Sequence, residues 1–156
     1  MRNAARSGVK SAAIVVMISA VLGCGAPMGP IPGGTLEGPE APWPEDWAFT
    51  RDIENVLLET KPEDPYSVTL WAVYVDDSFY VAGASSESRW VDNVLQQSEI
   101  RLAIEGTLYE GRASRVIDEG ELRSVGDAYT TKYEIDTGES STFIEDGGII
   151  FRLSSR

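Results

Sequence analysis

The sequence contains no histidine, so its candidates for chemistry are carboxylates, hydroxyls, lysines, arginines and one cysteine. The Ser-His-Asp and Cys-His catalytic arrangements are therefore excluded, and so are the usual zinc sites. Glu119 and Glu121 could pair in a hydrolase, but their spacing is also typical of a helix's solvated first turn. Asp76-Asp77 and Glu145-Asp146 lack the alternating oxygen ligands of a calcium loop, and turn chemistry explains them better. We expect no metal site, and catalysis would need carboxylates, lysine, tyrosine, arginine or a borrowed cofactor.

Cys24 is the only cysteine of the chain, so it cannot form an internal disulfide. It follows three basic residues and the uncharged apolar run of residues 11–22. That run is too short for a bilayer span, which takes about 20 residues, but it suits a signal peptide. The tetrad Val21-Leu22-Gly23-Cys24 resembles the lipobox of bacterial lipoproteins. We therefore expect residues 1–23 to be a lipoprotein signal peptide and Cys24 to carry acyl chains such as palmitate. The alternative is an ordinary secretory signal followed by a free cysteine.

Lipidation of Cys24 would hold the exported chain on a membrane of the cell envelope. Gly25, not an aspartate, follows the cysteine, which implies the outer membrane in a Gram-negative host. Removing residues 1–23 takes away three basic residues and no acidic one, so the net charge falls from −12 to −15. Such a charge disfavours nucleic acid and anionic headgroups as partners. A small anionic ligand is not excluded, because a local arginine acts within a Debye length of about 8 Å.

The prolines divide the mature chain into two parts. All eight lie before Tyr66, and six of them fall between Cys24 and Asp46. We expect residues 24–46 to be a Pro/Gly-rich tether that lifts the domain from the lipid, and residues 47–156 to be one domain with a single modest core. Trp43 and Trp47 are expected to cap that core.

The rest of the chain alternates between strand and helix patterns. Strands are expected over residues 56–60, 67–75, 79–84, 100–104 and 107–117, and around the Asp146-Gly147 turn signal. One helix should begin at Ser86 or Ser88 and bury Trp90, Val91, Val94 and Leu95, and another should begin at Asp118 and bury Leu122, Val125, Tyr129 and Tyr133. This order predicts an α+β fold, a small antiparallel β-barrel with two short helices. Five aromatic residues could line a pocket or fill the core: Trp71, Tyr74, Phe79, Tyr80 and Tyr109.

Residues 70–133 resemble the flavin- and deazaflavin-binding split-barrel proteins and, more closely, a small bacterial family of unknown function related to them. Three pieces carry the resemblance: the hairpin LWAVYVDDSFYVAGASS of residues 70–86, then Trp90-Val91-Asp92-Asn93, and finally DAYTTKY over residues 127–133. The resemblance implies a split barrel. It also implies that the phosphate of FMN or a deazaflavin is held between the second hairpin strand and the next helix, over residues 83–89.

The chemistry of that stretch suits an anion, because small residues allow close approach, hydroxyls donate, and a helix N-terminus offers free N–H groups. The candidate cofactor-binding residues are Ser85, Ser86, Ser88, Arg89, Trp90, Asn93 and Lys132. The alternative assigns the serines to helix capping, Arg89 to a solvated charge, Trp90 to the core and Asn93 to a neighbouring loop. Lys132 would then meet only the helix dipole. Glu87 counts against a phosphate.

Two functions remain. The one we prefer is a non-catalytic envelope lipoprotein whose barrel binds a small molecule or another envelope protein, because anchor and tether fit it without further assumption. The alternative is an FMN- or deazaflavin-dependent oxidoreductase acting on a small organic substrate. The export signal counts against it, because free cofactor is scarce outside the cytoplasm. The resemblance also implies a homodimer with the site at its interface. Whether the domain is catalytic stays open at this point.

Overall fold

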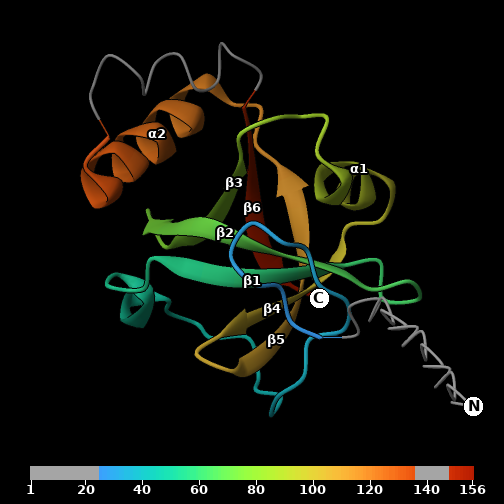
Figure 1. The fold of residues 1–156 in the computed structure, drawn as a ribbon. Coiled ribbons are helices and arrows are strands. Elements are labelled where there is room, and N and C mark those ends of the chain that lie inside the picture. Colours follow the sequence, from blue (N-terminus) through green and yellow to red (C-terminus); the bar gives the residue numbers. More distant parts are fainter. Residues whose placement is uncertain (1–24, 136–147) are drawn as a thin grey trace, which may run out of the picture.

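The computed structural model describes residues 25–135 and 148–156, and these form a closed barrel of six antiparallel strands in the order β1-β2-β3-β6-β5-β4 (Figure 1). The strands are β1 (Asn55–Thr60), β2 (Tyr66–Val75), β3 (Ser78–Gly83), β4 (Glu99–Ile104), β5 (Thr107–Arg115) and β6 (Ile149–Ser155). The helices are η1 (Ala48–Thr50), α1 (Arg89–Gln96) and α2 (Glu119–Tyr133). The α+β class, the antiparallel barrel and its two α-helices are thus confirmed. The turn signal at Asp146-Gly147 lies outside the described residues.

A two-residue hairpin turn sets the register of β2 against β3. Asp76 and Asp77 both have positive φ, at 50° and 57°, and they connect β2 to β3 where Val75 pairs with Ser78. A two-residue turn with positive φ at both positions matches the right-handed twist of the flanking strands. Aspartate tolerates this region better than most residues, so the turn was predictable from the sequence.

The barrel interior is filled by buried aliphatic and aromatic side chains. Trp47 is 3% exposed and stacks on Phe79 with ring centroids 4.8 Å apart, which confirms that it caps the core. Trp43 meets Trp47 edge to face at 4.9 Å. On the outside, α2 packs Val125 and Tyr129 against β2, β3 and β6 in a second apolar cluster.

Two expectations are wrong, one about the buried face of α1 and one about the end of β5. Leu95 of α1 is 54% exposed, and Asn93 is buried in its place because its amide donates to Thr60 Oγ1 at 2.9 Å. Strand β5 ends at Arg115, two residues early, because Ile117 leaves the sheet toward Asp118 and is 80% exposed. Asp118 then caps α2 as expected, its carboxylate accepting the N–H of Glu121 at 2.9 Å.

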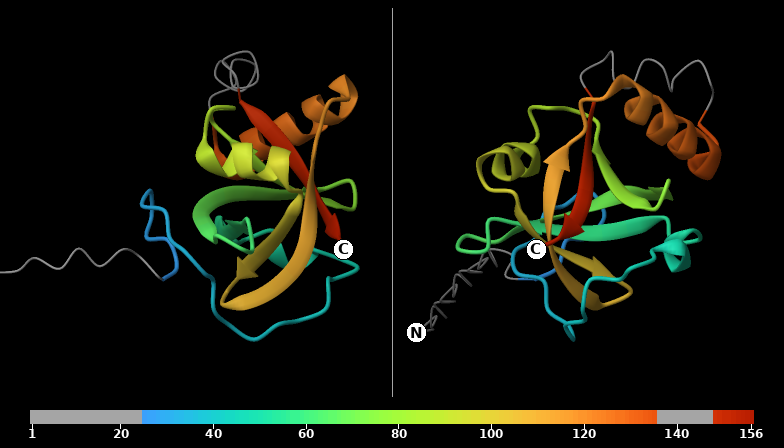
Figure 2. Two further views of the ribbon diagram at one scale, coloured as in Figure 1. Left: turned by 90° about the vertical axis from the view of Figure 1, so that its right-hand side faces the viewer. Right: turned by 180° about the vertical axis from the view of Figure 1, so that it is seen from behind.

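The proline-rich segment packs on the barrel over much of its length. Gly33 and Ser67 exchange two backbone hydrogen bonds of 2.9 Å, and residues 39–41 pair in the same way with Leu108 of β5. Figure 2 shows this segment following the barrel wall. We call residues 33–43 the strap. The ordered fold therefore begins well before residue 47, and the Pro/Gly-rich segment from Gly25 on is packed chain rather than a free tether.

Candidate functional site

The loop between β3 and α1 presents three hydroxyls, and that of Ser85 bonds the local chain. The Ser85 hydroxyl accepts the Glu87 N–H at 3.1 Å. Ser88 is the N-cap residue of α1 by position, but its side chain makes no capping hydrogen bond. Ser86 is exposed. The helix starts close to the strand because Gly83 has no side chain: a Cβ there would lie 2.8 Å from the Trp90 ring.

Arg89 points its charge at the β1–β2 turn. Its guanidinium lies 3.7 Å from the Asp64 carboxylate and 4.5 Å from the centre of the Tyr66 ring. Both charged side chains are more than half exposed, so the ion pair contributes little to stability. The cation that a phosphate at this loop would use is thus already shared with a carboxylate and an aromatic face.

Trp90 and Asn93 hold α1 on the barrel. Trp90 is 5% exposed and its ring centroid lies 5.4 Å from that of Phe151. Asn93 is 4% exposed and bound to Thr60 at the end of β1. Both residues therefore make packing contacts within the chain, in line with the alternative that assigns Trp90 to the core and Asn93 to a neighbouring segment.

Lys132 is remote from this loop, because α1 and α2 lie on opposite sides of the barrel (Figure 1). Its ammonium donates to three carbonyls: Thr50 at 3.2 Å, Ile53 at 2.6 Å and Ala72 at 2.8 Å. An ammonium has three donors, so all are used. Burial lowers the pKa of Lys132, partly opposed by the nearby carboxylates of Asp52 and Glu54. The lysine fastens η1 and the following chain to β2.

A flavin phosphate therefore does not fit the β3–α1 loop well. The loop offers one arginine, while Glu87 stands within it and Asp64 beside it, so a phosphate dianion would meet more negative than positive charge. The structure does not bring Lys132 to the loop, and it uses Trp90 and Asn93 to pack α1 on the barrel. The residues at this loop therefore do not form a site for a flavin phosphate.

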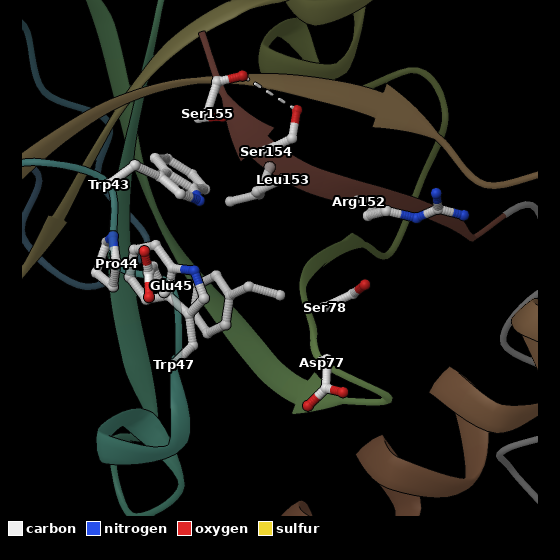
Figure 3. A pocket seen from close by; sticks show the side chains of 11 residues that line it. Trp43, Pro44, Glu45, Trp47, Asp77, Ser78, Arg152, Leu153, Ser154 and Ser155 are labelled. Atoms are coloured by element: carbon white, nitrogen blue, oxygen red, sulfur yellow. Dashed lines mark hydrogen bonds between the residues drawn. The ribbon is translucent and has the colours of Figure 1, made fainter.

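A groove of about 250 Å³ opens at the opposite end of β3 (Figure 3). Three stretches of chain form it: residues 43–47 between the strap and η1, the β2–β3 turn with the start of β3, and the C-terminal half of β6. It is lined by Trp43, Pro44, Glu45, Trp47, Asp77, Ser78, Phe79, Arg152, Leu153, Ser154 and Ser155. Gly111 of β5 lies behind Trp43, since a Cβ there would meet the indole at 2.3 Å.

The one cation of the groove lining is neutralised within the chain. Arg152 donates from Nε to Glu121 Oε1 at 2.8 Å, its Nη2 bonds the other oxygen, and Tyr80 donates to Oε1 at 2.9 Å. These hydrogen bonds lower the pKa of Glu121, while burial and the carboxylate raise the pKa of Tyr80. Among the residues that the structure describes, Glu45 and Asp77 form no ion pair, so the groove is acidic beside its aromatic wall.

Sequence reasoning missed this groove. The sequence predicts only that Trp43 and Trp47 cap the core, and it gives no separate signal that the acidic residues between them belong to a site. The pattern Trp43-Pro44-Glu45-Asp46-Trp47 was the available signal, but the strands that complete the groove lie far along the chain. The hydrolase reading is not supported either, because Glu121 is held by Arg152 and Tyr80. Residues 25–135 and 148–156 contain no cluster of three metal-ligating side chains and no helix long and apolar enough to cross a membrane.

Comparisons with solved structures relate this geometry to known folds. The conserved hypothetical protein Rv2991 of Mycobacterium tuberculosis is similar with a TM-score of 0.56 and 17% identity, covering 69% of this chain and 76% of that one. A proposed pyridoxamine 5′-phosphate oxidase of Listeria innocua gives a TM-score of 0.50 and 11% identity over 69% and 87% of the two chains. A proposed 5-nitroimidazole antibiotic resistance protein of Bacteroides thetaiotaomicron gives 0.52 and 13% over 70% and 80%. At these identities the similarity establishes the split-barrel fold alone.

A search of curated proteins found no match to the sequence. A family model described as "Uncharacterized protein conserved in bacteria (DUF2255)" matches residues 51–147. This match covers more than half of the chain and includes every strand of the barrel except β6. The chain therefore belongs to the bacterial family DUF2255, and its barrel is of the split-barrel type.

Proposed function

We propose that the protein is a lipid-anchored protein of the cell envelope whose split barrel is a non-catalytic binding domain, with the Trp43 groove as its binding site. One observation carries the proposal. Most side chains expected to hold a cofactor are engaged inside the chain, whereas the groove joins an aromatic wall to two carboxylates that form no ion pair within residues 25–135 and 148–156. Pockets of this kind bind through apolar contact and a few polar groups that fix orientation.

The chemistry of the groove favours a small ligand with a flat apolar part and a positive or hydrogen-donating group. Trp43 supplies the apolar surface, and Glu45 and Asp77 supply the acceptors. Arg152 adds little attraction for an anion because Glu121 already bonds its guanidinium. The net charge, −15 once residues 1–23 are removed, acts in the same direction.

Two matched probes test the groove: phenethylamine, a cation, and phenylacetate, its anionic counterpart. Indole N–H signals of the chain from Gly25 to Arg156, which keeps every described residue, would be followed by NMR, with Trp43→Phe to assign the Trp43 signal. We expect phenethylamine to move that signal saturably and phenylacetate to bind roughly fivefold or more weakly. Asp77→Asn with Glu45→Gln should remove the difference. Equal binding of the two probes, or no shift at Trp43, would reject the groove as described.

Anchoring is tested separately, in cells that process lipoproteins. The proposal rests on the apolar run of residues 11–22 followed directly by Val21-Leu22-Gly23-Cys24. Full-length protein should incorporate an alkyne analogue of palmitate and remain with the membrane fraction, while Cys24→Ser should lose both properties. Export without label would leave the binding domain but remove the anchor. In a Gram-negative host, Gly25 after the cysteine predicts the outer membrane.

A second candidate is an oxidoreductase that uses FMN or a deazaflavin. It is supported by the fold, since one similar structure is a proposed pyridoxamine 5′-phosphate oxidase. Such a cofactor would supply the redox chemistry, and this chain would contribute Arg89 and the hydroxyls of Ser85, Ser86 and Ser88 to its binding. The carboxylates at that loop weigh against it. A homodimer remains a prediction from the resemblance, and light scattering that finds only monomer at high concentration would reject it.

A further inference from the structure

A short apolar turn precedes the strap. Met28 and Ile31 exchange two backbone hydrogen bonds of 3.0 Å, and Gly29, with φ of 56°, and Pro30 form the bend between them. Glycine with positive φ at the first central position is typical of a tight hairpin turn. Directly paired residues carry their side chains on the same side, so the two apolar side chains are neighbours. Met28 is 72% exposed and Ile31 61%.

The base of this turn is fastened to the barrel. Gly34 donates to the carbonyl of Gly25 at 2.9 Å, and Gly33 pairs with Ser67 of β2. The two arms lie so close that a Cβ on Gly33 would meet the Gly25 oxygen at 2.3 Å. Figure 2 (left) shows the segment, in blue, projecting from the side of the barrel. The turn is therefore a defined projection of the domain.

Its position along the chain places it beside the predicted anchor. Cys24 precedes Gly25, and consecutive Cα atoms lie about 3.8 Å apart. Because Gly25 belongs to the base of the turn, acyl chains on Cys24 would be attached at that base. Residues 25–36 also contain no charged side chain, in a chain with 25 acidic residues. This stretch is therefore free of the charge that elsewhere opposes contact with a membrane.

We propose that the Met28–Ile31 turn inserts into the membrane interface next to the acyl anchor and fixes the orientation of the barrel on the lipid surface. The inference rests on the proposed lipidation of Cys24. Apolar side chains gain free energy when they leave water for the acyl region, and an anchor that holds them at the surface removes most of the cost of association. The uncharged turn suits a zwitterionic surface and needs no anionic lipid.

The test attaches the chain to lipid chemically, so that it does not depend on cellular lipidation. The single thiol of the chain from Cys24 to Arg156 is coupled to a maleimide-bearing phospholipid in phosphatidylcholine vesicles. Met28→Trp adds a reporter in the turn, and the uncoupled parent chain provides the background of the native tryptophans. Ile117→Trp is the matched control, because Ile117 is equally apolar and exposed but precedes α2, which lies away from the blue segment in Figure 2.

We expect the Met28→Trp reporter to shift to the blue on coupling and to lose roughly half or more of its emission with dibrominated phosphatidylcholine. The Ile117→Trp reporter should keep its emission. Coupled protein whose residue-28 reporter is not quenched, or is quenched no more than residue 117, would overturn the insertion. That failure would leave the lipidation of Cys24 untouched, and a failure of palmitate labelling in cells would leave this measurement valid.

Discussion

At the scale of single residues, Lys132 shows how a side chain with apparent binding chemistry can be structural. The sequence offered it as a ligand for an anion or as a partner of the helix dipole. Its acceptors are instead the carbonyls of Thr50, Ile53 and Ala72, which come from η1, the chain after it, and β2. No spacing rule links a lysine in a helix to carbonyls about 60 to 80 residues earlier in the chain.

Lys132→Met should therefore destabilise the fold. Three carbonyls lose their donor, and the aliphatic replacement keeps only the packing of the stem. We expect the free energy of unfolding in urea to fall by roughly 1–3 kcal/mol. Arg123→Met, on the exposed face of the same helix, is the control and should change it little. Equal stability of the two variants would mean that the carbonyl contacts contribute nothing.

Glu121 gives a prediction about how the unfolding free energy depends on pH. Hydrogen bonds from Arg152 and Tyr80 lower the pKa of this carboxyl in the folded state, so the unfolded chain binds more protons as the solution is acidified. The stability from Glu121 is thus present above its unfolded pKa of about 4.3 and is lost as pH falls through the lower folded value. Glu121→Gln should show a smaller loss of unfolding free energy between about pH 6 and pH 3 than the parent. Glu119→Gln, two residues earlier and exposed, should lose as much unfolding free energy over this pH range as the parent does.

At the scale of elements, the strands and helices were largely predictable, and the strap was not. The alternation of apolar and polar residues in β4 and the aspartates of the turn before β3 are local signals, and the strands that they predict are present in the structure. A proline-rich segment lacks such periodicity, so its composition predicts only an extended chain. What holds it is tertiary: the buried carboxylate of Glu59 accepts the Leu36 N–H at 2.5 Å, and Arg101 bonds both Glu59 and the Leu36 carbonyl.

Arg101→Met tests that attachment. Glu59 is 1% exposed, and removing its partner leaves a buried carboxylate without a compensating charge. We expect a loss of roughly 3–5 kcal/mol in unfolding free energy and faster hydrogen exchange at the Leu36 amide. Arg112→Met on the neighbouring strand, where the side chain is exposed, serves as the control. Unchanged exchange at Leu36 would show that the strap is held by other contacts.

At the scale of the whole molecule, the order of elements and the resemblance over residues 70–133 were enough to predict the split barrel. The candidate site was not predictable in the same way. The sequence placed it where related folds hold a phosphate, but the local charges near Arg89 do not favour an anion there. The groove is assembled from the strap, the β2–β3 turn and β6, and only the closed barrel brings these together. The proposed function, a membrane-anchored binding barrel, rests on this groove and on the motif that ends at Cys24.

The most direct test of that account is a titration of the chain from Gly25 to Arg156 with FMN and with a deazaflavin coenzyme, followed by the fluorescence of the cofactor. The proposed function predicts no saturable quenching up to about 100 μM, because Arg89 at the β3–α1 loop stands against two carboxylates, Glu87 in the loop and Asp64 beside it. Saturable binding at micromolar concentration that is lost in Arg89→Ala would contradict it. Such binding would place a cofactor phosphate at Ser85–Arg89 and favour the oxidoreductase.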